Sequence, residues 1–153
     1  MKGRCYISHV ATIDLAINDL DALGAACKRL GMELRRDQQT YKWWGSSVGD
    51  YEVPEGVTVE DLGKCDHALS VVGNDRAYEI GVCRSRGQSN SKWTLLYDFF
   101  QGGYGLVEKV GQDCCRLKQA YATEVAIKQA KKQGFMVHEF AQQDGTVRLR
   151  CTK

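Results

Sequence analysis

Residues 67–84 read HALSVVGNDRAYEIGVCR, and residues 92–100 read KWTLLYDFF. Both halves of the first stretch are rich in β-branched and aromatic residues, and they flank a turn-forming Gly-Asn-Asp-Arg at positions 73–76. Together the two stretches predict a three-stranded antiparallel meander. The last strand is apolar on both faces except at Thr94 and Asp98, which is typical of a central strand covered by helices.

Helical signals lie on both sides of this meander. Upstream, residues 6–17 alternate like a strand, Asn18 can cap a helix that ends at Gly31, and residues 32–44 resume an extended pattern. Downstream, residues 106–133 predict a short helix followed by a longer one, and residues 135–140 and 146–151 predict a hairpin over an Asp-Gly turn. We therefore expect a single α+β domain over residues 1–153, with an antiparallel sheet of hairpins and a meander backed by about three helices.

Two segments interrupt the periodic pattern. Residues 45–66 combine glycine, serine, the only proline and several acids, so we expect a long acidic surface loop there. Residues 101–105, Gln-Gly-Gly-Tyr-Gly, lack the spacing of a phosphate-binding loop and predict a flexible connector.

Composition excludes several classes of protein. The chain has 153 residues, 43% of them hydrophobic, and a formal net charge of +2, which argues against disorder. No apolar run has the roughly 20 residues of a membrane helix, and no apolar segment follows the basic N-terminus as in a secretory signal. We expect a cytoplasmic protein or one from an equivalent reducing compartment: host cytoplasm if viral, plastid stroma if algal.

The seven cysteines are odd in number and scattered, without a CxxC pair. Reduced, mostly buried thiols are therefore favoured over a disulfide framework. The local candidates for zinc ligands, Cys65 with His67 and Cys114 with Cys115, lack the two close pairs of a structural zinc site. We accordingly expect no metal and no cofactor.

Six short stretches of the chain form a recognisable set: residues 7–13, 19–23, 78–82, 117–122, 134–137 and 144–149. Together they resemble the hypothetical chloroplast reading frame 35 family, whose members occur in cyanobacteria, some algal plastids and bacteriophages. The resemblance implies a compact, intracellular α+β protein, and it transfers no catalytic residues because the family has no assigned function. Residues 97–100 depart from the family pattern, in which a tryptophan follows the acid.

Charge is unevenly distributed along the chain. From Lys109 to Lys153 there are nine Lys and Arg against four acids, an excess of +5, so the remainder of the chain carries about −3. Such polarity can attract phosphate or acidic surfaces, although a solvated helix face is the plainer reading. Nucleic acid is possible but not favoured, because the isoelectric point near 8.1 is modest and no recognised motif is present.

These observations favour a non-enzymatic binding or accessory protein for an anionic, nucleotide-like ligand or an acidic protein surface. One form is a phage protein that sequesters a host nucleotide signal. The alternative is a subunit or assembly factor that docks on a larger complex, and an enzyme that uses Cys or His ranks last. A homo-oligomer is possible. The candidate ligand-binding residues are Trp44, Arg84, Arg86, Asp98, Lys118 and Tyr121, and we expect Asp98 to be paired in the core, for example with Arg84.

Overall fold

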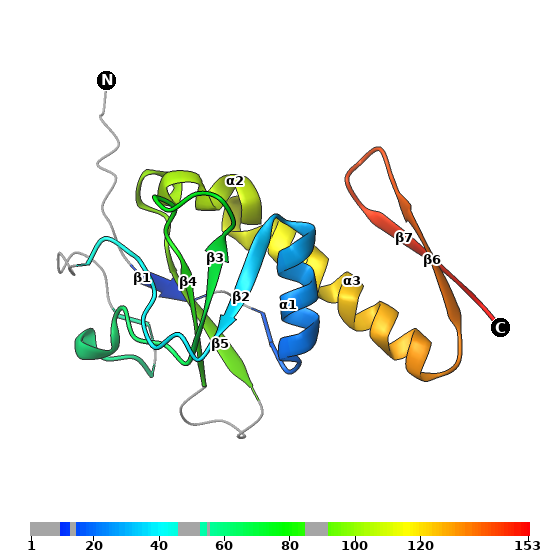
Figure 1. Cartoon of the computed structure of the whole chain (residues 1–153), viewed down its shortest axis with the longest axis horizontal. Helices are drawn as coiled ribbons and strands as arrows, with labels where there is room; N and C mark the ends of the chain where they lie inside the picture. The colour runs from blue at the N-terminus through cyan, green and yellow to red at the C-terminus, as the bar shows by residue number, and fades with distance from the viewer. Residues whose placement is uncertain (1–9, 13–14, 46–52, 55, 85–91) are drawn as a thin grey trace.

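A five-stranded antiparallel sheet forms the centre of the molecule (Figure 1). The computed structural model describes residues 10–12, 15–45, 53–54, 56–84 and 92–153. The strands follow the order β1-β5-β4-β3-β2, so the predicted meander is confirmed and β5 is an internal strand. Their bounds are β1 Val10–Thr12, β2 Met32–Arg36, β3 His67–Val71, β4 Ile80–Arg84 and β5 Trp93–Asp98.

Three helices are described, and two of them are long. The α1 helix spans Leu20–Arg29 and α3 spans Cys115–Lys132, whereas α2, Leu106–Val110, has only five residues. The α+β class is confirmed, but the expected three-helix backing reduces to two long helices and one short segment. The α1 cap is Asp19 rather than the predicted Asn18, since the Asp19 carboxylate accepts hydrogen bonds from the N–H groups of Asp21 and Ala22 at 2.9 and 3.0 Å.

The helices cover one face of the sheet. Leu23 of α1, Leu117 of α3 and Leu95 of β5 are fully buried in one hydrophobic cluster, together with side chains from β3 and β4. Removing such side chains from water supplies the main driving force for folding. The sheet and the helices are therefore joined by a continuous apolar layer.

The other face of the sheet is covered by the chain between β2 and β3, in which Tyr41 falls in the predicted strand and Leu62 and Cys65 fall in the predicted surface loop. Tyr41 and Cys65 pack on Ala68 and Leu96, and Leu62 adds to the same cluster. Both faces of β5 are thus covered, as its composition predicts, but the helices cover only one of them. The second half of the acidic 45–66 segment is part of the fold, with a 3-10 helix at Val59–Asp61.

The strands are shorter than their sequence patterns suggest. Of the first predicted strand, residues 10–12 form β1, residues 6–9 and 13–14 lie outside the described residues, and residues 15–17 add only an isolated bridge from Ile17 to Trp93. The strand predicted over 32–44 ends at Arg36, and the next residue, Asp37, has a φ of 60°. A left-handed residue there turns the chain onto the second face.

Residues 101–105 form a defined turn, which corrects the prediction of a flexible connector. Gln101, Gly102, Gly103 and Tyr104 have φ values of 53°, 64°, 61° and 52°, so four successive residues are left-handed. The Gly103 carbonyl accepts a 2.8 Å bond from the N–H of Tyr78, and the Tyr104 carbonyl accepts a 3.1 Å bond from the Asn74 amide. Glycine populates this region without steric cost, which explains the glycine-rich composition.

The cysteines follow their prediction only partly. Cys27, Cys65 and Cys114 are buried, Cys83 is half-buried, and Cys115 and Cys151 are exposed. Cys5 lies outside the described residues.

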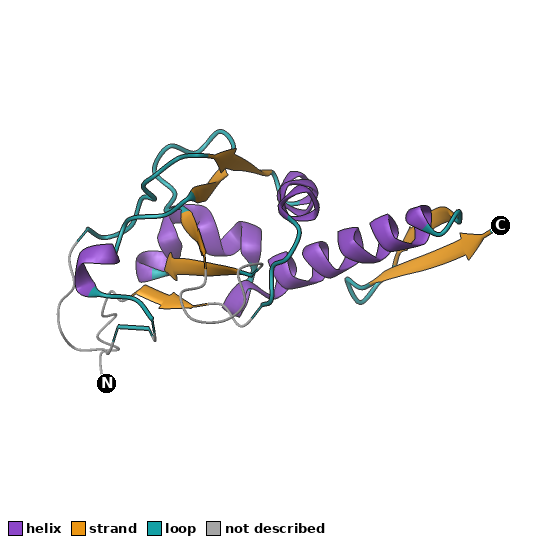
Figure 2. Ribbon diagram, turned by 90° about the horizontal axis from the view of Figure 1, so that it is seen from below, coloured by secondary structure: helices purple, strands orange, loops and turns teal. Residues whose placement is uncertain are grey.

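A separate two-stranded sheet completes the fold. Strands β6, Met136–Ala141, and β7, Val147–Thr152, form the hairpin predicted at the C-terminal end. Figure 2 shows this hairpin beside the outer part of α3, at the end of the molecule where the chain finishes. It pairs with no strand of the five-stranded sheet in the described part of the chain.

Candidate functional site

Asp98 and Trp44 are the two predicted site residues that the structure brings together. The Asp98 side chain is 1% exposed at the end of β5, where it accepts hydrogen bonds from the N–H groups of Phe100 at 2.9 Å and Trp44 at 3.4 Å. The Trp44 ring is 45% exposed and lies on the Phe100 ring, with centroids 4.5 Å apart. The buried carboxylate thus ties an exposed aromatic residue to the start of the left-handed turn.

Arg84 lies elsewhere, so the predicted Arg84–Asp98 pair is wrong. Arg84 is opposite Trp93 at the start of β5, and its guanidinium lies 5.3 Å from the centre of the Trp93 ring. Its N–H donates to the Asp66 carboxylate at 3.0 Å. Asp98 ends the same strand, and at about 3.3 Å per residue the two ends of β5 are roughly 16 Å apart.

Tyr121 and Lys118, two further predicted site residues, both lie on α3. The Tyr121 hydroxyl accepts hydrogen bonds from the N–H groups of Asn18 and Asp19, at 3.0 and 3.2 Å, and so holds the start of α1. Lys118 is half-buried near Cys114. Burial raises the pKa of the Cys114 thiol to about 12, and the Lys118 charge offsets part of that rise.

Arg86, the sixth predicted residue, lies outside the described residues. The described members of the predicted set are therefore distributed over three places: the Trp44–Asp98 contact, the Arg84–Trp93 contact, and the α1–α3 junction. The last is structural, because both groups that Tyr121 satisfies are backbone N–H groups.

A more continuous exposed surface is on the hairpin. Directly opposite residues of an antiparallel pair share a face, so the register places Met136, His138, Phe140, Arg148, Arg150 and Thr152 together. We call these six residues the outer face. Met136 is 63% exposed and Phe140 is 47% exposed, and His138, Arg148 and Arg150 are exposed as well. This surface combines two cations with two large apolar side chains.

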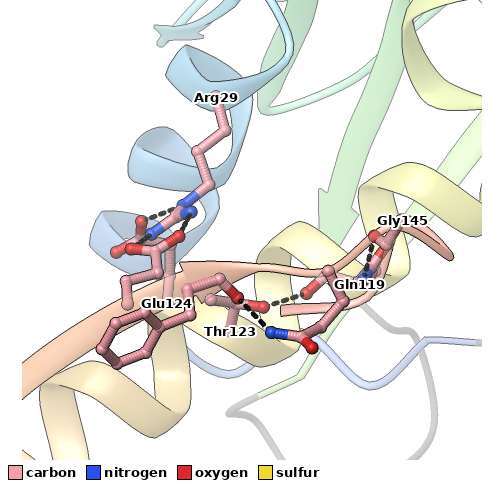
Figure 3. A network of polar contacts seen from close by, with 8 residues as sticks. Arg29, Gln119, Thr123, Glu124 and Gly145 are labelled. Atoms are coloured by element: carbon pink, nitrogen blue, oxygen red, sulfur yellow. Dashed lines mark hydrogen bonds and ion pairs between the residues drawn. The ribbon is translucent and has the colours of Figure 1, made fainter. Parts of the chain in front are cut away.

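The opposite side of the hairpin, its inner face, is directed toward α3. Val137, Val147 and Leu149 on this face are half-buried. The Gln119 side chain of α3 donates a 2.8 Å hydrogen bond to the carbonyl of Gly145 in the hairpin turn (Figure 3). The hairpin therefore leans on α3 by one face and exposes the other.

An ion-pair junction fixes the hairpin to the helices. The Arg29 guanidinium at the end of α1 contacts the carboxylates of Glu124 on α3, at 2.5 Å, and Glu139 on β6 (Figure 3). A second nitrogen of Arg29 donates to Glu139 at 2.8 Å. The hydrogen bond from Arg29, together with its charge, holds the pKa of the Glu139 carboxyl below its ordinary value.

No residue from Glu124 to Lys153 is buried, although all of them are described. We call this segment, residues 124–153, the C-terminal arm. The chemistry of its outer face was not identified among the predicted site residues. The signal was present in the sequence, because Arg148 and Arg150 are two residues apart in a strand, as are Met136, His138 and Phe140.

Within the described ranges, no group of three or more His, Cys, Asp or Glu side chains is arranged to hold a metal ion. None of the described helices is both long and apolar enough to cross a membrane.

Comparison with known proteins places the chain only at the level of a family. The family model described as "Protein of unknown function (DUF1257)" matches residues 26–150. No curated protein and no solved structure gives a significant match.

Proposed function

The chain belongs to the DUF1257 family of proteins of unknown function, and we propose that it is a non-enzymatic accessory protein whose hairpin docks on an acidic protein partner. The observation that carries this proposal is the outer face, a strand surface on which Arg148 and Arg150 lie beside Phe140.

The C-terminal arm has the properties of an interaction element. An isolated two-stranded hairpin is only marginally stable in water, and this one is supported on a single face. Its outer face leaves Met136 and Phe140 exposed, which costs hydrophobic free energy until a partner covers them. Docking would remove that cost.

The residue types favour a protein partner over nucleic acid. Met, Phe and Arg are enriched at the centres of protein interfaces, whereas lysine is depleted there. The outer face has two arginines and no lysine, and the arm's lysines, such as Lys128, Lys131 and Lys132, lie on α3 or at the C-terminus. We expect carboxylates on the partner opposite the two arginines, because a guanidinium group pairs with a carboxylate in bidentate geometry.

The test measures binding of the full chain to poly-L-glutamate, used as an acidic polypeptide probe. The double variant R148E/R150E should bind about tenfold or more weakly at low salt, because two charge-assisted contacts become repulsive. The matched control is the double variant K64E/R76E, which reverses two exposed cations outside the arm and should bind like the wild type.

A single-stranded oligonucleotide and a panel of nucleoside triphosphates serve as competing probes. Stronger binding of the oligonucleotide with the same dependence on Arg148 and Arg150 would replace the protein partner by nucleic acid. Equal loss in both double variants would show that only overall charge matters, and the proposal would fail.

The nucleotide-like ligand stays a prediction, since its expected residues lie in separate places. Two narrower expectations also stay predictions. One is that a phage protein sequesters a host nucleotide signal, and the other is the relationship to the hypothetical chloroplast reading frame 35 family.

A further inference from the structure

The hairpin has a defined hydrogen-bond phase. The Gln142 N–H donates to the Thr146 carbonyl at 2.9 Å, so this opposite pair is a hydrogen-bonded one. Hydrogen-bonded and non-hydrogen-bonded pairs alternate along an antiparallel ladder. Phe140 with Arg148 and His138 with Arg150 are therefore also hydrogen-bonded pairs. The main-chain N–H and C=O groups of Val147, Leu149 and Cys151 consequently point away from β6, to the open side of β7.

The open side of β7 is the accessible edge of the hairpin. No hydrogen bond or ion pair joins a residue of β7 to any described residue outside the hairpin. Among the described residues, β6 likewise makes no backbone hydrogen bond outside the hairpin. However, β6 is held to α1 through Glu139 and Arg29. A six-residue strand in which alternate residues direct unpaired main-chain groups to the open side is a template for another strand.

The side chains of β7 define what such a strand must carry. Arg148 and Arg150 are on the outer face, whereas Val147, Leu149 and Cys151 are on the inner face. A second copy of β7, paired antiparallel about Leu149, would place Arg148 of one chain opposite Arg150 of the other. Like charges directly opposite each other destabilise a pair of strands, so self-pairing through this edge is disfavoured.

We infer that β7 adds an extended segment of the partner protein as a third strand, and that this segment alternates acidic and apolar residues. The acids lie opposite Arg148 and Arg150, and the apolar residues lie beside Val147 and Leu149. This inference rests on the proposed function, which needs only side-chain contacts, and it adds main-chain pairing as the mode of recognition.

The probe is a blocked peptide, Glu-Val-Glu-Val-Glu-Val-Glu, with a Lys-Val peptide of the same length as control. The wild-type chain should bind the glutamate peptide about tenfold or more tightly than the lysine peptide, and R148E/R150E should reverse that order. The K64E/R76E variant should keep the wild-type preference.

Main-chain methylation of the peptide separates edge pairing from side-chain docking. Only alternate residues of an added strand direct their N–H groups at β7: the valines in an antiparallel arrangement and the glutamates in a parallel one. Methylation of one set should weaken binding about tenfold or more, and methylation of the other set should leave it unchanged.

Two results would overturn the inference in distinguishable ways. If both methylated peptides bind as well as the parent peptide, in a manner that depends on Arg148 and Arg150, the edge pairing is wrong and the proposed docking stands. If neither the peptide nor poly-L-glutamate binds with that dependence, the proposed function fails as well.

Discussion

At the scale of single residues, Gly81 shows how the second face of the sheet constrains the sequence. A Cβ atom at this position would lie 2.4 Å from Cδ1 of the Tyr41 ring, which is closer than side-chain carbons approach. Tyr41 is 3% exposed and has little room to shift. The glycine in β4 is therefore required by the tyrosine packed over it.

Gly81→Ala should lower the free energy of unfolding by about 1–3 kcal/mol, because the methyl group overpacks this contact. Urea-induced unfolding measures the change. Gly24→Ala is the matched control, because Gly24 lies inside α1 and its added Cβ would be at an ordinary distance, 3.7 Å, from the Leu34 side chain. This variant should raise the free energy of unfolding by up to about 1 kcal/mol. Equal stability of the two variants would contradict this account of Gly81.

The same scale shows what residue-by-residue sequence reading misses. Asp98 is buried, as its place in an apolar strand predicts, and it accepts hydrogen bonds from the backbone N–H groups of Trp44 and Phe100, whereas Arg84 lies opposite the start of β5. The sequence predicts Tyr121 as a ligand-binding residue, and it does not show that the Tyr121 hydroxyl accepts hydrogen bonds from the backbone at the start of α1. Hydrogen bonds of this kind join residues about a hundred positions apart, as between Asn18 and Tyr121, and no local pattern encodes them.

At the scale of elements, two similar junctions have different outcomes. Both α1 and α3 end in basic residues followed by a glycine with φ near 70–85°, at Gly31 and Gly134, and each continues directly into a strand. Capping chemistry predicts the helix ends and strands correctly in both cases. It does not predict that β2 joins the five-stranded sheet while β6 stays outside, because that depends on which strands remain unpaired in the whole fold.

The junction at Arg29 makes the hairpin sensitive to acid. Arg29 lowers the pKa of Glu139, and Thr146 lowers that of Asp144 in the hairpin turn. A carboxyl whose pKa is depressed on folding stabilises the fold above its unfolded pKa, and this contribution is lost as the pH falls through the folded pKa.

Lowering the pH from about 6 to about 3 should therefore reduce the hydrogen-exchange protection factors of the β6 and β7 amides, which compare each rate with the intrinsic rate at the same pH, before those of β3 and β4. Glu139→Gln should already exchange faster in the hairpin at neutral pH and change less on acidification. Asp144→Asn is the control that leaves the Arg29 contact intact. Hairpin exchange that tracks the main sheet at every pH would argue against a separately held arm.

At the scale of the whole molecule, the buried residues stop before the chain does. Every described buried residue lies at or before Thr123, and the C-terminal arm contributes only half-buried side chains. Composition predicts one folded domain, and the order of the predicted strands and helices predicts the α+β class. The extent of the chain that lies outside this core could not be predicted, since the helical and strand patterns of the arm look like those of core elements.

A chain shortened to end at Phe135 should keep the fold of the main sheet. Gly134 and Phe135 still donate their N–H groups to the carbonyls of Lys131 and Ala130, so the end of α3 stays capped. The melting temperature should change by no more than about 5 °C, because no buried residue is removed. Near-ultraviolet circular dichroism measures it, and loss of the cooperative transition would show that the hairpin is part of the core.

Because no position of the C-terminal arm is packed in the core, substitutions on its outer face do not draw on the stability of the sheet. Most proteins must balance changes at a binding surface against the risk of unfolding. Here the two requirements fall on different stretches of the chain, so related proteins can diverge in the partner that they recognise while the sheet and its helices keep their architecture.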